Sequence, residues 1–151
     1  MSLEFRWSRF DALSTREFYE IVTAREAVFV VEQQCAYQEV DALDPLAWHL
    51  LATVNDQLAA YVRLVGPGEK FAEPSIGRVM TLEAFRGRQY GRALMSEAIR
   101  FTEEIYPGLG IKIGAQVYLT TFYASFGFVA VSAPYDDDGI LHIDMRKPAV
   151  V

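Results

Sequence analysis

The sequence has a single cysteine and lacks any apolar run long enough to cross a membrane. One cysteine, Cys35, excludes an internal disulfide framework and suits a reducing compartment. A membrane-spanning helix needs roughly 18 consecutive apolar residues. The first ten residues, MSLEFRWSRF, carry charges where a signal peptide would be apolar. The sequence therefore predicts a cytoplasmic protein with no membrane partner.

Basic residues are in the minority, and several motifs are absent. Lys and Arg total 14 against 20 Asp and Glu, a formal net charge of −6, which disfavours nonspecific binding to nucleic acid. The G-x-x-x-x-G-K-[ST] phosphate loop and the G-x-S-x-G nucleophile turn are both missing. No His, Cys and carboxylate residues cluster at metal-ligand spacing. We therefore expect neither a nucleic-acid partner nor a metal.

The composition that remains is that of an ordinary globular protein. Of the 151 residues, 52% are hydrophobic and 23% are charged, which predicts one domain over residues 1–151 with a substantial core. Ser14 and Glu17 stand at capping-box spacing and open a helix from about 15 to 32. Residues 33–46 form an irregular acidic segment. Alternating apolar patterns predict strands at 3–8, 47–54, 58–65, 75–82, 110–116, 128–133 and 140–146.

The order of these elements indicates a mixed α/β fold. Asn55-Asp56-Gln57 joins two strands as a hairpin, and the acidic loop PYDDDG joins the last two strands. A helix between 75–82 and 110–116 makes one β–α–β crossover, which should be parallel and right-handed. A second, short helix is expected at 118–125. This order differs from a doubly wound dinucleotide fold, which alternates throughout.

The most informative segment is IGRVMTLEAFRGRQYGRALMSEAIRFTEEI, residues 76–105. It reads as a strand, then a turn with two glycines, then an amphipathic helix with Leu94, Ala98, Phe101 and Ile105 on one face. Three arginines and no acid lie in residues 86–92, here called the basic turn. Glycine-rich backbone before a helix amino terminus is a favourable anion site, and phosphate or pyrophosphate is the anion we expect. An ordinary solvated turn is the alternative.

Two blocks in this chain resemble the GNAT acetyltransferase superfamily. RGRQYGRA at 86–93 is similar to the superfamily's acetyl-CoA signature, and TFYASFGF at 121–128 is similar to its F-Y-x-x-x-G-F segment. FVVEQ at 29–33, GAQ at 114–116 and GILHI at 139–143 look closer to the ElaA-type branch. One departure is Gln89, which stands where most members have a middle glycine. The resemblance implies a central, mostly antiparallel sheet of six to seven strands with flanking helices and one parallel crossover.

The resemblance also implies an activity, namely acetyl transfer from acetyl-CoA, as co-substrate, to an amine. Backbone amides of the basic turn would hold the pyrophosphate, and the pantetheine arm would lie along strand 75–82. A backbone N–H near Val79 would stabilise the oxyanion, Tyr123 would protonate the departing thiolate, and Gln116 would contact the cofactor. The implied cofactor-binding residues are Val79, Met80, Thr81, Arg86, Gly87, Arg88, Gln89, Tyr90, Gly91, Arg92 and Gln116.

The group that accepts a proton from the amine is not evident from the sequence. Candidates are Glu32, Asp41, Asp44, His49 and His142, of which Glu32, His49 and His142 are also candidates for binding the acceptor. The acids at 39–44 could instead attract a cationic amine. His49 could be a hydrogen-bonded core residue, and His142 a surface one. The acceptor is either a small-molecule amine or a protein amino group, and a homodimer is compatible with the fold.

Two other functions fit parts of the same pattern. A non-catalytic acyl-CoA sensor or scaffold would keep the basic turn, although coenzyme binding alone would not require a phenol at Tyr123. A nucleotide-binding domain of unrelated fold is disfavoured, because the chain has a single crossover and its glycine turn comes late.

Overall fold

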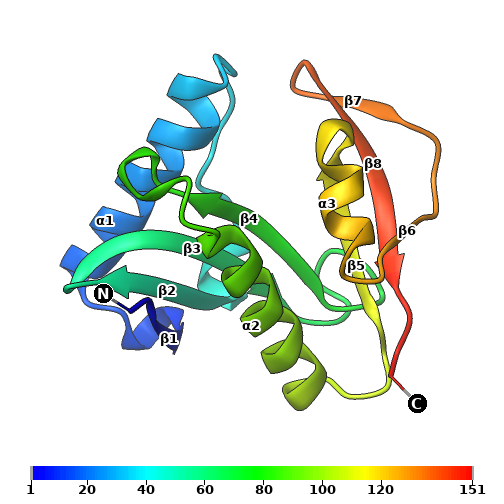
Figure 1. The fold of residues 1–151 in the computed structure, drawn as a ribbon, viewed down its shortest axis with the longest axis horizontal. Helices are drawn as coiled ribbons and strands as arrows, with labels where there is room; N and C mark the ends of the chain where they lie inside the picture. Colours follow the sequence, from blue (N-terminus) through cyan, green and yellow to red (C-terminus); the bar gives the residue numbers. More distant parts are fainter. Residues whose placement is uncertain (1, 151) are drawn as a thin grey trace.

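The computed structural model describes residues 2–150, and the strands in this range form two antiparallel sheets of four strands each (Figure 1). The first sheet has the order β1-β2-β3-β4, and the second has β5-β8-β6 with β7 also paired to β8. The predicted mixed fold with mostly antiparallel strands is thus confirmed. The strands are β1 Glu4–Arg9, β2 Trp48–Val54, β3 Gln57–Val65, β4 Ser75–Thr81, β5 Ile111–Gln116, β6 Val129–Ala130, β7 Tyr135–Asp137 and β8 Ile140–Lys147.

Within the described residues, the α-helices are α1 Thr15–Arg25, α2 Tyr90–Ile105 and α3 Thr120–Ala124. The predicted capping box opens α1: Ser14 Oγ accepts from the Glu17 amide at 3.0 Å, and the Glu17 carboxylate accepts from the Ser14 amide at 2.9 Å. The predicted helix over 15–32 is helical throughout, but Glu26–Glu32 continues α1 as a π-helix. Over residues 2–150, no helix has both the length and the apolar character needed to cross a membrane.

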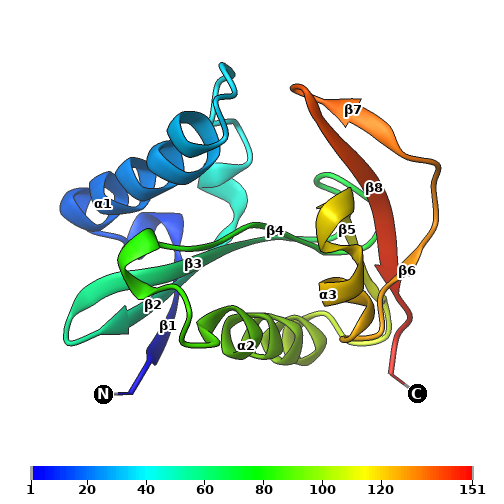
Figure 2. The same ribbon diagram turned by 45° about the horizontal axis from the view of Figure 1, so that its top comes forward.

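The first sheet lies between two helices, with α1 on one face and α2 on the other (Figure 2). Strand β3 shows why, because its side chains alternate between the faces. Val62 and Leu64 pack in the cluster that contains α2, whereas Tyr61 packs with Ile21 of α1. The helix stripe predicted from residues 94–105 faces the α2 cluster, so both helices bury apolar faces against one sheet.

The β–α–β crossover does not produce one continuous sheet. Strands β4 and β5 meet near their beginnings, where the Lys112 amide donates to the Pro74 carbonyl at 3.1 Å. They then diverge, and no ladder joins them among residues 2–150 (Figures 1 and 2). The expected central sheet is therefore divided in two. Strand β4 also contains a bulge, and bulges bend and twist the strand that carries them.

The carboxyl-terminal hairpin also differs from expectation. The predicted strand over 128–133 is reduced to Val129–Ala130, and part of the predicted acidic loop forms β7. Asp138 and Gly139 have φ of +52° and +82°, the left-handed pair that a tight type I′ hairpin turn requires. Asp-Gly is a strong hairpin signal, so this turn was readable from the sequence.

His49 is a core residue. Its side chain is fully buried, Nδ1 lies 2.5 Å from the Tyr61 hydroxyl, and Nε2 lies 3.0 Å from the Asp44 carbonyl oxygen. A neutral ring satisfies both contacts, with Nε2–H donating to the carbonyl and Nδ1 accepting from the phenol. Burial, and then the nearby Arg25 and Arg63, lower the pKa of His49. The geometry therefore supports the alternative in which His49 is a hydrogen-bonded core residue.

This burial predicts a pH-dependent stability. The pKa of His49 is lower in the folded chain than in the unfolded chain, so below pH of about 6.5 the unfolded chain binds a proton more readily. The free energy of unfolding therefore falls as pH drops below about 6.5. One such group gives a slope of at most about 1.4 kcal/mol per pH unit. Chemical denaturation between pH 7 and 5 should show this slope in the wild type and a flatter one in His49→Gln. The matched variant is His142→Gln; loss of the slope there, with retention in His49→Gln, would contradict the assignment.

Candidate functional site

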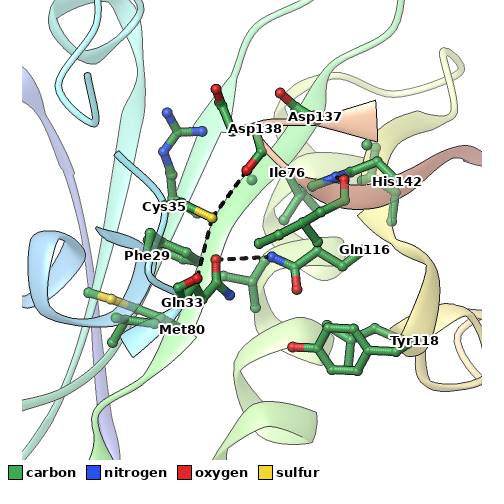
Figure 3. A pocket seen from close by; sticks show the side chains of 18 of the residues that line it. Phe29, Gln33, Cys35, Ile76, Met80, Gln116, Tyr118, Asp137, Asp138 and His142 are labelled. Carbon is green, nitrogen blue, oxygen red and sulfur yellow. Dashed lines mark hydrogen bonds between the residues drawn. The ribbon is translucent and has the colours of Figure 1, made fainter. Parts of the chain in front are cut away.

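The diverging strands enclose a cavity of about 700 Å³ (Figure 3). Its walls come from the π-helix and the segment after it, from β4 and β5, from α3 and the turn before it, and from the β7–β8 hairpin. The predicted site residues that line it are Glu32, Val79, Met80, Thr81, Arg86, Gln116, Tyr123 and His142. Sequence reasoning had given no role to several other lining residues, including Phe29, Gln33, Tyr37, Arg78, Tyr135 and Asp137.

Strand β4 carries a bulge where it lines the cavity. The β3–β4 register pairs Tyr61 with Met80 and Arg63 with Gly77, so two residues, Arg78 and Val79, oppose Val62 alone. Arg78 has a φ of +51°, in the left-handed region that side chains other than glycine rarely occupy. Val79 has no partner in this register. Its backbone therefore stands outside the regular pairing of the two strands.

The basic turn ends in a helix terminus without a cap. Gly87 has a φ of +83°, and Gln89, the residue in place of the expected glycine, has a φ of +60° and a ψ of +23°. Gln89 therefore has the left-handed backbone conformation that the expected glycine would adopt easily. No side chain caps α2, and its first turn has no acidic residue. The first amides of α2, together with the helix dipole, are thus available to an anion.

The three arginines of the basic turn point to different neighbours. Arg86 donates to the Thr81 carbonyl at 2.9 Å and pairs with Glu32 at 2.9 Å. Arg92 donates to Ser125 Oγ at 3.1 Å and lies 4.6 Å above the Phe126 ring. Arg88 lies 5.8 Å from the Phe85 ring. Only Arg86 among them lines the cavity within the part of the chain described, and its pairing with Glu32 joins the basic turn to the π-helix.

Tyr123 reaches the cavity from α3. It is 7% exposed, with its ring against Phe122 and Phe128 at centroid distances of 5.2 and 6.1 Å. Burial, together with the nearby Tyr118, raises the pKa of Tyr123 to about 12. The phenol therefore stays protonated at neutral pH, and no described residue forms a hydrogen bond with its hydroxyl. It is a proton donor without a protein acceptor.

The far side of the cavity is built by β5 and the β7–β8 hairpin. Gln116 and His142 are register partners, and Gln116 Nε2 donates to Gln33 Oε1 at 3.4 Å. Cys35 Sγ lies 3.3 Å from the Asp138 carbonyl oxygen, so two contacts bridge the cavity from the segment after the π-helix (Figure 3). His142 Nδ1 lies 2.8 Å from the Ile140 carbonyl, so in the neutral ring Nδ1 carries the proton and Nε2 is the acceptor.

Gly114 allows the hairpin to close over β5. The Tyr135 hydroxyl donates to Asp144 Oδ1 at 2.7 Å, and its ring stacks on His142 at a centroid distance of 6.1 Å. A Cβ on Gly114 would approach that hydroxyl to 3.1 Å. The absence of a side chain at Gly114 thus sets the position of the wall that carries His142.

The acidic residues at 39–44 do not line the cavity. Glu39 and Asp44 are 4% and 1% exposed, and both pair with the fully buried Arg25. Burial alone would raise the pKa of Asp44, but its hydrogen bond with Arg25 and the charges of Arg25 and Arg63 lower it below the usual value. Asp41 also pairs with Arg63, at 2.7 Å. The hypothesis that these acids attract an amine is therefore wrong for Glu39 and Asp44, and Asp44 is not an available base.

Sequence reasoning missed this ion-pair network, although a signal existed. Ile21, Arg25 and Val28 follow one another at helical spacing, so Arg25 falls on the apolar face that packs on the sheet. An arginine on such a face requires buried acids as partners.

Comparison with known proteins agrees with this geometry. The profile of the "Acetyltransferase (GNAT) domain" family matches residues 14–149. The chain belongs to this family. A UPF0039 protein of Synechocystis is 46% identical over 96% of this chain and 95% of its own length. Protein ElaA of Escherichia coli is 39% identical over 91% of this chain and 92% of its own length, which confirms the ElaA-type resemblance.

Two solved structures share the fold along almost the whole chain. An acyl-CoA N-acyltransferase from Pseudomonas aeruginosa superposes with a TM-score of 0.92 at 39% identity, covering 97% of this chain and 99% of that one. The E. coli ElaA structure gives 0.90 at 37% identity, with the same coverage. Membership of the GNAT family supports acyl transfer from an acyl-CoA as the general activity.

The left-handed Gln89 predicts a stabilising substitution. A residue with a Cβ in this conformation costs roughly 1 kcal/mol relative to glycine. Gln89→Gly should therefore raise the free energy of unfolding by about 1 kcal/mol, and Gly87→Ala, at φ +83°, should lower it by a similar amount. Urea denaturation of both variants measures this. A less stable Gln89→Gly would mean that residue 89 does not have the left-handed conformation.

Proposed function

We propose that this protein transfers an acetyl group from acetyl-CoA to a primary amine, by direct attack in a ternary complex. The observation that carries the proposal is the cavity between β4 and β5, which has a bulged strand edge on one side and a phenol without a protein hydrogen-bond partner on the other. The acceptor is a small-molecule amine or a protein amino group. A reducing, cytoplasmic compartment agrees with the single cysteine.

The residues of the basic turn fit a diphosphate. Gly87 and Gln89 curve the backbone, and the uncapped amides that begin α2 lie at the positive end of a helix of 16 residues. A Cβ on Gly91 would meet no atom within 4 Å, so the first turn of α2 is open on that side. In this proposal the amides of residues 87–92 bind the diphosphate, and Arg86 or Arg88 adds charge-assisted hydrogen bonds.

Strand β4 supplies the next two functions. In this proposal the edge of β4 that faces away from β3, at Val79, Met80 and Thr81, aligns the pantetheine arm in the place that a neighbouring strand would take. The Val79 N–H, which the bulge leaves outside the β3–β4 register, then donates to the thioester oxygen as negative charge develops there. A single donor of this kind is typically worth about 100-fold or more in rate.

Tyr123 and His142 are the proposed proton carriers. Nucleophilic attack of the amine forms the amide bond and breaks the thioester C–S bond, and Tyr123 donates its proton to the departing thiolate. His142 Nε2 is a free acceptor on the opposite wall and takes the proton that the amine loses, directly or through water. Gln116 lies beside His142 and contacts the coenzyme arm.

Acetyl transfer and simple binding are separable by experiment. Free thiol release with acetyl-CoA over a panel of amines should exceed the rate without amine, whereas an acyl-CoA sensor would bind without turnover. Calorimetry should detect coenzyme A and acetyl-CoA but not NAD. Propionyl-CoA and butyryl-CoA test the choice of acyl group.

Tyr123→Phe should lower kcat by about 100-fold and leave acetyl-CoA affinity within a factor of two, because it removes a proton donor and keeps the ring. Steady-state kinetics and calorimetry measure the two quantities. Tyr19→Phe is the matched control, since Tyr19 is 71% exposed and lies on α1 outside the cavity. An equal loss of affinity and rate in Tyr123→Phe would make Tyr123 a packing residue.

A further inference from the structure

The bulge residue Arg78 combines an unfavourable backbone conformation with a side chain that contacts a distant segment. Its φ of +51° lies in the left-handed region, which is unfavourable for a residue other than glycine. Its guanidinium contacts the segment after the π-helix: Nε lies 2.8 Å from Glu39 Oε1, and Nη2 lies 3.3 Å from the Glu39 carbonyl and 3.4 Å from Asp41 Oδ2. These contacts join the bulge to an element that is distant in sequence.

The partner of Arg78 is itself immobilised. The Glu39 carboxylate also accepts from Arg25 Nε and, at 2.6 Å, from the Tyr37 hydroxyl. Arg25 is fully buried and also pairs with Asp44. Asp41 is bound by Arg63 of β3, the strand that the bulge faces. The two acids that pair with Arg78 are thus themselves paired with arginines of α1 and of β3.

We propose that the Arg78–Glu39 ion pair is a positioning device that holds the β4 bulge open toward the cavity. The peptide unit between Arg78 and Val79 contains the Val79 N–H, and the backbone angles of Arg78 orient that unit. Without the pair, residue 78 returns to extended backbone, and Val79 moves toward register with β3. This inference rests on the proposed function in one respect, namely that the Val79 N–H is the donor to the thioester oxygen.

Stability alone does not account for this arrangement. Buried ion pairs contribute little net stability, since desolvation offsets their attraction. The Arg78 side chain is 20% exposed, more than the side chains of Glu39 and Arg25, which are 3% and 0% exposed. Its removal leaves Glu39 paired with Arg25 and Tyr37, so no buried charge loses all its partners. Truncation at Arg78 therefore tests geometry in a protein that still folds.

Two variants at one position separate positioning from direct contact with substrate. Arg78→Ala removes the ion pair and disfavours the left-handed conformation, whereas Arg78→Gly removes the same pair and permits that conformation. We expect kcat to fall at least tenfold in Arg78→Ala and to recover at least threefold in Arg78→Gly, with KM for acetyl-CoA within a factor of two in both. Arg100→Ala, which breaks an exposed ion pair on α2, is the control and should match the wild type.

Equal kcat values in Arg78→Ala and Arg78→Gly would overturn the proposal, because a group that contacts substrate is lost in both alike. A fall in kcat that matches only the fraction of unfolded protein would overturn it as well. Crystal structures of both variants give a readout independent of activity. Residue 78 should leave positive φ in Arg78→Ala and keep it in Arg78→Gly; an unchanged bulge in Arg78→Ala contradicts the inference. If the wild type transfers no acetyl group, the proposed function fails, and these structures still decide whether the ion pair holds the bulge.

Discussion

Strands β4 and β5 part soon after they begin, and the cavity of this protein lies where they separate. Beyond the hydrogen bond from the Lys112 amide to the Pro74 carbonyl, no ladder joins the two strands among residues 2–150. Buried peptide groups rarely remain without partners. A sheet that opens in this way requires something to occupy the gap, and an extended molecule with amide groups of its own, such as the pantetheine arm, suits it.

Two features flank the gap. On one side, the bulge at Arg78 leaves Val79 outside the β3–β4 register, and the Arg78 side chain pairs with Glu39. On the other side, Tyr135 of β7 reaches past Gly114 to Asp144 of β8, and the ladder between β8 and β5 completes that wall. The walls of the cavity thus combine charge pairing and close backbone approach between regions far apart in the sequence.

Much of this architecture could be predicted, because the relevant signals are local. The capping box at Ser14, the hairpin at Asn55 and the apolar stripe of α2 follow from residues a few positions apart. The division of the sheet could not be predicted, since no local pattern in residues 75–82 signals the bulge or the contact of Arg78 with Glu39 from another part of the chain. Similarly, local pattern placed His49 and Asp44 among the candidates, but only tertiary structure shows one in the core and the other paired with Arg25.

A crystal structure with coenzyme A is the decisive experiment for the proposed binding site. We expect the diphosphate on the amides of residues 87–92 and the pantetheine arm between β4 and β5, with the thiol near Val79 and Tyr123. Density for the coenzyme elsewhere, or a continuous ladder joining β4 to β5 in the bound protein, would contradict it.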